Sequence, residues 1–387
     1  MPPNQNPKKF DFLVGLSIDG CKLLELVGHG HYGAVFRASE PDKEASVAVK
    51  IMRAPKPGSS KEILLCNELE ALRRLRTCQT TTYLHRVVKR DGLLCLVMDY
   101  CDGGDLWNPV MRDRKFVGDS ALTGRVFGMM LDAVQDVHNV DFAHRDLKPE
   151  NFLTDSGLEH LWLADFGLAT QGRETDKFGR GTPAYLPPEG WTPDLERIDA
   201  FRGDVFALGV TLFQMLYGEY PWCRAIAHDK HWDDFVAYRT DFFRNCDKWA
   251  GKRGGPPVSR EAHVLLSAAL EPKMESRIDM PEFRRRFHDI NDFFVPLESI
   301  PSDVHAPIGV RHAPDLASDS SSDSESDAGP ATPRRISSHL PPGGATLGLF
   351  KNVYDDDERE GKGRQPSTGI RAWIRRLVVR PSSSASR

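Results

Sequence analysis

The chain of 387 residues can hold one large domain with tails, or two modest domains. A formal net charge of -4, with 27% charged residues, argues against a chain-wide basic attraction to nucleic acid. The seven cysteines form an odd set without a C-x-x-C pair, which argues against a disulfide framework and a zinc site. Since neither a signal peptide nor a membrane span is apparent, we expect a cytoplasmic or nuclear protein without a transmembrane segment. We also expect a monomer.

Composition divides the chain into three parts. Residues 1–17 are rich in Pro and Asn and predict a flexible N-terminal tail. A continuous apolar pattern over residues 18–295 predicts a folded domain. Residues 296–387 are dominated by Ser, Asp, Gly and Pro, which bury too little apolar surface to offset the entropy of ordering. We therefore expect this last part to be mostly disordered.

The first third of the folded part predicts a β-sheet interrupted by one helix. The predicted strands are residues 21–28, 33–40, 46–52 and 93–101. Leucines at helical spacing predict the helix, over residues 62–76. The remainder is mainly helical, as in residues 122–140 and 204–218. A small strand-rich lobe followed by a larger helical lobe is an α+β arrangement, and the boundary between such lobes is a natural ligand cleft.

The stretch GHGHYGAV places Gly28, Gly30 and Gly33 in G-x-G-x-x-G spacing. Alone this is weak evidence, because the same spacing marks the turn that opens a helix in dinucleotide-binding domains. Here a second strand-like segment follows instead of a helix. The pattern therefore favours a hairpin whose backbone lies over phosphates, because glycine lets the backbone approach closely.

Lys50 lies on a predicted strand between apolar residues, where an unpaired ammonium would be costly to bury. Glu68 is the best carboxylate partner, because Leu65, Leu69 and Leu72 direct the apolar face of its helix toward the sheet. A nucleotide phosphate is a second candidate partner. The alternative is a lysine that reaches solvent, which is common on strands.

The stretch HRDLKPEN, residues 144–151, gathers two basic side chains, two carboxylates, an amide and an imidazole. Each of its tripeptides alone would suit an ordinary turn. Downstream, Asp165 follows an apolar strand and precedes Phe166 and Gly167. Carboxylate and amide oxygens suit Mg²⁺, so Asp165 and Asn151 are candidates to hold metal ions that bridge phosphates. Asp146 would then accept a proton from an incoming hydroxyl.

Five motifs in order, GHGHYGAV, VAVK, HRDLKPEN, DFG and GTPAYLPPE, resemble those of the eukaryotic protein kinases over roughly residues 20–290. The resemblance implies the bilobal protein-kinase fold, with an N-lobe at residues 18–98 and a C-lobe at residues 102–295. It also implies ATP and Mg²⁺ as cofactors and proteins as substrates.

The resemblance assigns a catalytic role to five residues. Asp146 would be the catalytic base, and Lys148 would neutralise the γ-phosphate. Lys50 would hold the α- and β-phosphates and pair with Glu68. Thr182 would bond both the base and Lys148.

The implied nucleotide site draws on both lobes. Asn151 and Asp165 would bind magnesium. The residues implied to contact ATP are Gly28, His29, Gly30, His31, Tyr32, Gly33, Val35, Ala48, Lys50, Met98, Asp99, Cys101, Asp105 and Leu153. Within this set Met98 matches the gatekeeper and Asp105 the ribose contact. The apolar members that would enclose the adenine, Val35, Ala48 and Leu153, are more often plain core in an arbitrary protein.

Lys148 and Thr182 resemble the Ser/Thr-specific kinases in particular. The position of Arg145, directly before the base, implies a switch by phosphorylation of the segment between Asp165 and Glu189, in which Thr175 is the best-placed hydroxyl. Acidic neighbours on both sides of Thr175 could satisfy Arg145 without a phosphate, so constitutive activity is favoured. Loss of the usual Ala in the APE motif leaves Glu189 able to pair with an arginine, which we assign as Arg277.

Asp105 and Glu150 match positions where kinases of basic substrates hold an arginine. They predict a mild preference for Arg three residues before the phosphorylated residue, although Gln214 replaces a further Glu. The segment GEYPWCRAIAHDKHWDDFVAYRTDFFRN is similar to the fungal Ser/Thr kinases that repress sexual conjugation and meiosis and act in nutrient signalling. This similarity predicts a nutrient-linked or developmental role.

Two rival functions are a pseudokinase scaffold and a small-molecule phosphotransferase. Lys50, Asp146 and Asp165 are all present, which disfavours the scaffold. The motif GTPAYLPPE together with Arg277 belongs to peptide-binding kinases, which disfavours the phosphotransferase.

Residues 369–380, GIRAWIRRLVVR, form a basic segment with the pattern of an amphipathic helix. Its apolar face would comprise Ile370, Trp373, Ile374, Leu377 and Val378. Three docking sites are open for it: a membrane surface, a groove of a partner, or the kinase domain of the same chain.

Overall fold

The computed structural model describes residues 11–30, 33–41, 44–90, 92–193 and 195–295, together with the backbone of residues 378–379. These described residues belong to one compact unit. Most of the two predicted tails lies outside them, so their predicted disorder stays a prediction. Within the described part, no helix is both long and apolar enough to cross a membrane.

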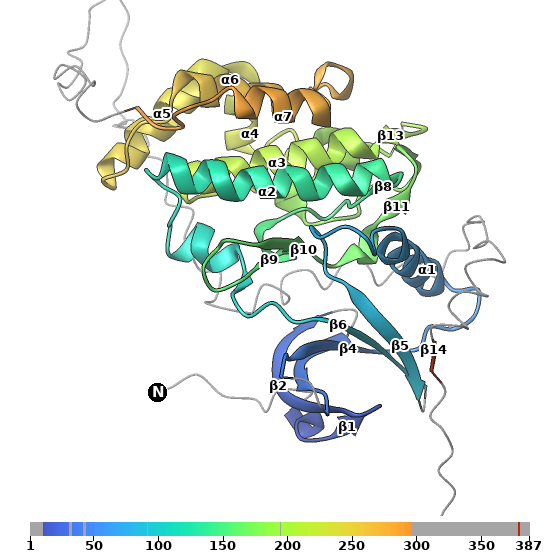
Figure 1. Cartoon of the computed structure of the whole chain (residues 1–387). Helices are drawn as coiled ribbons and strands as arrows, with labels where there is room; N and C mark the ends of the chain where they lie inside the picture. Colours follow the sequence, from blue (N-terminus) through green and yellow to red (C-terminus); the bar gives the residue numbers. More distant parts are fainter. Residues whose placement is uncertain are drawn as a thin grey trace, which may run out of the picture. The chain divides into compact units, whose positions relative to one another are not determined.

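A twisted sheet forms the N-terminal lobe, with strand order β1-β2-β3-β4-β6-β5-β14 (Figure 1). Its strands are β1 (Ser17–Ile18), β2 (Cys21–Gly30), β3 (Gly33–Ser39), β4 (Val47–Arg53), β5 (Leu84–Arg90), β6 (Leu93–Asp99) and β14 (Val378–Val379). The pairings are antiparallel, except that of β14 with β5, which is parallel. β5 was not predicted from the sequence, because its only two buried residues, Val87 and Val88, are adjacent and therefore lack the alternating pattern of a strand.

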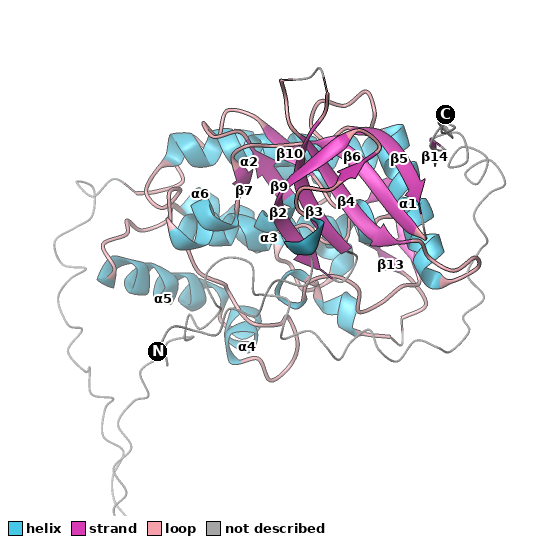
Figure 2. Cartoon of the chain, turned by 90° about the horizontal axis from the view of Figure 1, so that it is seen from below, coloured by secondary structure: helices cyan, strands magenta, loops and turns pink. Residues whose placement is uncertain are grey.

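One helix, α1 (Ser60–Arg74), packs on this sheet (Figure 2). It begins after Ser59, whose side chain accepts a hydrogen bond from the backbone N–H of Glu62, a favourable N-terminal cap. Leu65 and Leu69 form an apolar cluster with residues of β5 and β6. The predicted orientation is therefore confirmed for these two leucines, whereas Leu72, also predicted to face the sheet, belongs to the apolar cluster of the second lobe.

The second lobe is built on two long helices, α2 (Ser120–Asn139) and α3 (Ala200–Tyr217). Nearly every residue of α3 is buried, which explains its continuous apolar sequence. Each of the two helices starts at an aspartate, Asp119 or Asp199, whose carboxylate accepts a backbone N–H of the first turn. The other helices are α4 (Lys230–Ala237), α5 (Arg239–Lys252), α6 (Arg260–Ala269) and α7 (Met280–His288).

Short elements lie between the sheet and these helices. The strands are β7 (Gly104–Asp105), β8 (Phe142–Ala143), β9 (Phe152–Thr154), β10 (Leu161–Leu163), β11 (Thr170–Gln171), β12 (Glu174–Thr175) and β13 (Ile198–Asp199). The short helices are Asp11–Leu13, Asn108–Arg112, Pro149–Asn151, Phe166–Leu168, Pro183–Tyr185, Pro188–Trp191 and Met274–Ser276. The whole is the predicted α+β architecture of a strand-rich lobe followed by a helical one.

The structure corrects one expectation for the segment at residues 369–380. Val378, predicted on a helical face, instead lies in β14, opposite Val87 of β5. Two adjacent β-branched residues favour extended backbone, and an edge strand offers unpaired backbone groups to complete. The other residues of the predicted apolar face lie outside the described part.

A buried ion pair between Arg277 and Glu189 joins two distant segments of the second lobe. Arg277 donates two hydrogen bonds to Glu189, from Nη1 to Oε1 at 2.6 Å and from Nη2 to Oε2 at 2.9 Å. The two side chains are 0% and 5% exposed. Arg277 also donates to the carbonyl oxygens of Arg202 and Glu271, which helps to offset the cost of desolvating the guanidinium.

We expect Arg277→Met to lower the free energy of unfolding by about 3–5 kcal/mol, because it leaves the Glu189 carboxylate buried without its counter-ion. Urea denaturation of the full chain measures this loss. The matched control is Arg285→Met, which removes an exposed arginine paired with Glu282, and should leave the midpoint unchanged. Adding Glu189→Leu to Arg277→Met should restore part of the stability; equal midpoints for Arg277→Met and the control would contradict the assignment.

Candidate active site

The loop that carries Asp146 is held by a carboxylate beneath it. Asp204, on α3 and 1% exposed, accepts the backbone N–H of His144 at 2.9 Å and that of Arg145 at 2.8 Å. The ring nitrogen Nε2 of His138 lies 2.9 Å from the same carboxylate. Arg145 has a φ of +68°, a left-handed conformation that costs of order 1–3 kcal/mol in a non-glycine residue. The charged hydrogen bonds from Asp204 stabilise this strained turn.

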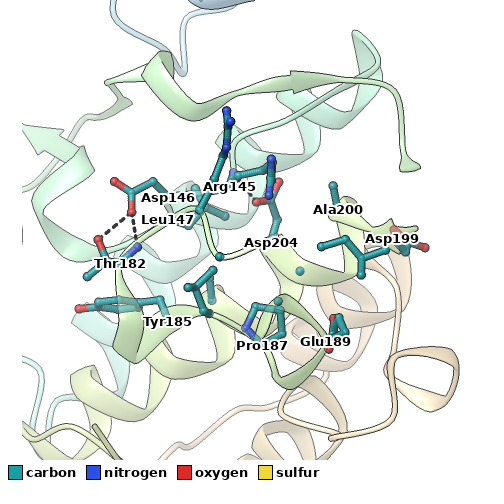
Figure 3. Close-up of a pocket in the computed structure, with 17 residues that line it drawn as sticks. Arg145, Asp146, Leu147, Thr182, Tyr185, Pro187, Glu189, Asp199, Ala200 and Asp204 are labelled. Atoms are coloured by element: carbon teal, nitrogen blue, oxygen red, sulfur yellow. Dashed lines mark hydrogen bonds between the residues drawn. The ribbon is translucent and has the colours of Figure 1, made fainter. Parts of the chain in front are cut away.

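Three side chains and one backbone group fix the position of Asp146. The hydroxyl and the backbone N–H of Thr182 donate to Asp146 Oδ1 at 2.7 and 2.9 Å, as Figure 3 shows. Lys148 Nζ donates to Asp146 Oδ2 and to Thr182 Oγ1, both at 2.7 Å. Asn151 Nδ2 donates to the backbone oxygen of Asp146 at 2.6 Å. The carboxylate is therefore held in one orientation, next to a cation.

A second charged group joins the two lobes. Lys50 Nζ, on β4, lies 2.6 Å from Glu68 Oε1 on α1 and 3.1 Å from Asp165 Oδ1, which follows β10. Burial opposes the charged form of Lys50, but Asp165 and Glu68 outweigh it, so the pKa of Lys50 is raised. Lys50 in turn lowers the pKa of Asp165 to about 2, so that this carboxylate, still 45% exposed, stays ionised.

The strand register pairs several of the residues predicted to contact the nucleotide. Cross-strand partners are Val35 with Lys50, Ala48 with Met98, and Asp105 with Leu153. The first two pairs lie on adjacent strands of the N-terminal sheet, and the third lies on β7 and β9 of the other lobe. Asp99 and Cys101, at the end of β6 and just beyond it, are half-buried.

The predicted glycine-rich hairpin is formed by β2 and β3. Gly28 lies opposite Val35, and Gly30 lies opposite Gly33. Gly33 has a φ of +139°, and a Cβ there would lie 2.1 Å from the backbone oxygen of Ile51, so no other residue fits without a shift. The two residues at the tip of the hairpin, His31 and Tyr32, lie outside the described residues.

Glu150 has a carboxylate that its surroundings leave incompletely satisfied. Its Oε2 atom is buried and has no hydrogen-bond partner among the described residues. Burial raises the pKa of Glu150 to about 7, although Lys148 opposes the shift. Close to it, Tyr185 donates a hydrogen bond of 3.0 Å to Gln214 Oε1. The sequence predicted that Glu150 faces a substrate but contained no signal for its burial.

The segment between Asp165 and Glu189 is held in place by short strand pairs. β12 pairs with β13, so that Thr175 lies opposite Ile198. Thr175 is 5% exposed, and its hydroxyl accepts the backbone N–H of Lys177. Arg145 donates to the carbonyl oxygen of Lys177. In this conformation Thr175 is covered, and a modifying enzyme would first have to open β12.

A pocket opens beside Asp146, between this segment and α3 (Figure 3). Its lining includes Arg145, Asp146, Thr182, Tyr185 and Leu186. Asp146, the candidate base, and its partner Thr182 therefore both line this pocket.

Comparison with known proteins agrees with this geometry. The family described as "Protein kinase domain" matches residues 21–286, which is more than half of the chain. A protein of Schizosaccharomyces pombe named "Negative regulator of sexual conjugation and meiosis" is 27% identical over 301 residues, covering 72% of this chain and 61% of that protein.

Other relatives come from plants and budding yeast. "CBL-interacting serine/threonine-protein kinase 19" of Arabidopsis thaliana is 32% identical over 265 residues, covering 66% of this chain and 50% of the relative. "Serine/threonine-protein kinase KIN4" of Saccharomyces cerevisiae is 31% identical over 206 residues, covering 51% and 25%. The chain thus spans less than two thirds of the length of each of these relatives. The match to the family over residues 21–286 shows that this chain belongs to the protein kinases.

Proposed function

We propose that the chain is an active Ser/Thr protein kinase, which transfers the γ-phosphoryl group of ATP to serine or threonine hydroxyls of proteins. The observation that carries this proposal is the contact set of Asp146 with Lys148 and Thr182. A carboxylate with a fixed orientation beside a cation suits proton abstraction next to a group that gains negative charge. The names of the relatives, which include Ser/Thr kinases, support the choice of substrate hydroxyl.

The residues divide the reaction between them. The substrate hydroxyl oxygen forms a bond to the γ-phosphorus as the bond from that phosphorus to the β–γ bridging oxygen breaks, and ADP leaves. Asp146 accepts the hydroxyl proton, and Lys148 stabilises the charge on the transferred group. Lys50, oriented by Glu68, holds the α- and β-phosphates.

Asn151 and Asp165 would hold magnesium with the phosphates. Their amide and carboxylate oxygens are hard ligands, and the low pKa of Asp165 keeps it ionised. The part of the chain that the structure describes contains no cluster of three or more His, Cys, Asp or Glu that could hold a metal by itself. Phosphate oxygens and water would complete the coordination, and the bound ion would neutralise phosphate charge.

Two finer aspects of the proposal rest on the relatives and on composition. The name of the fission-yeast relative, which refers to sexual conjugation and meiosis, supports a developmental role for this chain. We propose in addition that the role is linked to nutrient signalling. We also propose that it acts as a monomer in the cytoplasm or nucleus on protein substrates, without binding nucleic acid.

We expect Asp146→Asn to lower the rate of phosphate transfer by about 10²–10⁴-fold, because the amide cannot accept the hydroxyl proton. Transfer from labelled ATP to an arrayed Ser/Thr peptide library measures this, with ATP affinity as a second readout that should stay near the wild-type value. Asp141→Asn makes the same chemical change at an exposed turn and should leave the rate unchanged. A wild-type protein that binds ATP but phosphorylates no peptide would instead support a scaffold.

Glu150 supports a preference for basic residues on the substrate. An ionised carboxylate with an unsatisfied buried oxygen is a partner for a guanidinium, which is a strong hydrogen-bond donor to carboxylates. Asp105 is a second acid close enough for its charge to raise the pKa of Glu150, and burial raises the pKa of Asp105 as well. We propose that these acids favour arginine three residues before the phosphorylated residue.

This preference should depend on pH. Because the pKa of Glu150 is about 7, its negative charge is present at pH 8 and mostly lost at pH 6. We expect the ratio of kcat/KM for an Arg-containing peptide to that for its Ala analogue to fall by up to about tenfold from pH 8 to pH 6. Because both peptides are measured with the same enzyme, any effect of pH on the catalytic groups cancels in this ratio of kcat/KM values. In Glu150→Gln it should be small at both pH values; a wild-type ratio that is large and constant would contradict the role of Glu150.

A further inference from the structure

A segment from the far end of the chain closes one edge of the N-terminal sheet. β14 pairs in parallel with β5, with Val378 opposite Val87 and Val379 opposite Val88. Figures 1 and 2 both draw β14 beside β5. On its other side β5 pairs with β6, so β5 would be the edge strand of the sheet without β14. Such an edge presents unpaired backbone N–H and C=O groups that can accept another strand.

The strand that β14 covers is also the strand against which α1 rests. Val87 is fully buried in one apolar cluster with Leu65 and Leu69 of α1. α1 carries Glu68 on its buried face, where it contacts Lys50 at 2.6 Å. A continuous line of contacts therefore runs from β14 through β5 and α1 to the Lys50–Glu68 pair.

β5 is anchored at one further point beside this pairing. Arg86 Nε donates to Asp19 at 2.9 Å, and Arg86 Nη1 lies 2.7 Å from Glu40. These contacts tie β5 to the β1–β2 turn and to the end of β3. They do not involve α1. That helix contacts β5 at Val87, in the central part that β14 covers, and it also packs on Leu94 and Leu96 of β6.

The pairing has the properties of a contact that can be released. Only two residues of β14 take part, and a hydrogen bond contributes about 1 kcal/mol net. Each strand has two adjacent valines within a short basic sequence, RVVKR at residues 86–90 and RLVVR at residues 376–380. Like charges on neighbouring strands weaken a pairing. The covalent link between this segment and the domain offsets the weakness of the pairing, because it gives the segment an effective concentration of about millimolar at β5. A free peptide would need a similar concentration to replace it.

We propose that residues 378–379 form a docking strand of this chain which, by pairing with β5, holds α1 where Glu68 reaches Lys50. Release of the strand loosens β5 and α1 and lowers the rate of phosphate transfer. The effect on rate rests on the proposed kinase function, whereas the docking and its effect on α1 do not.

The test uses the full chain with the double substitution Val378→Pro and Val379→Pro, because proline lacks the backbone N–H and does not fit a strand ladder. Ser384→Pro with Ala385→Pro is the matched control in the same C-terminal segment. Amide hydrogen exchange is followed in residues 84–90 of β5 and 60–74 of α1. Transfer to a Ser/Thr peptide is measured on the same samples.

We expect the Val378/Val379 variant to exchange about tenfold faster in β5, with faster exchange in α1 and severalfold slower transfer. The control should match the wild type. A synthetic peptide of residues 369–382, added at millimolar concentration, should restore protection in β5. Unchanged exchange in β5 would overturn the docking, and faster exchange in β5 with α1 unaffected would overturn the coupling. If the wild type transfers no phosphate, the kinase proposal fails. The hydrogen exchange of β5 and of α1 still tests the docking of residues 378–379 and its coupling to α1.

Discussion

The carboxylate of Asp204 is the constraint on which the rest of the site depends. It lies inside the second lobe on the most buried helix and accepts the backbone N–H groups of His144 and Arg145. These bonds hold Arg145 in a left-handed conformation, and the turn so formed directs Asp146 toward Thr182 and Lys148. Without this buried acceptor, the backbone would relax to an ordinary turn and the proposed base would lose its position.

Two buried ion pairs extend this order to the neighbouring segments. Lys50 contacts Glu68 of α1 and Asp165 of the second lobe, so one ammonium links the sheet to the helical part. Arg277 holds Glu189 and thereby the end of the segment that carries Thr182. In both cases several partners share the buried cation, which offsets a desolvation cost that a single partner would not cover.

The N-terminal sheet has an outer edge at β5 that another segment of the chain completes. The second lobe surrounds its central helix with other helices, whereas the sheet has an outer strand whose backbone can be completed by another segment. The pairing of β5 with β14 uses this property. Thr175, in contrast, lies in the β12–β13 pair inside the domain and is 5% exposed.

The sequence by itself determined the family, the order of the two lobes and the identity of the proposed catalytic groups. Glycine spacing, helical periodicity and short charged motifs are local, so they can be interpreted without knowing the neighbours in space. Only the tertiary structure decided the pairing of Val378 and Val379 with β5, the burial of Thr175 and the raised pKa of Glu150. Strand pairing, burial and desolvation depend on residues far apart in the chain, and no local pattern specifies which of them meet.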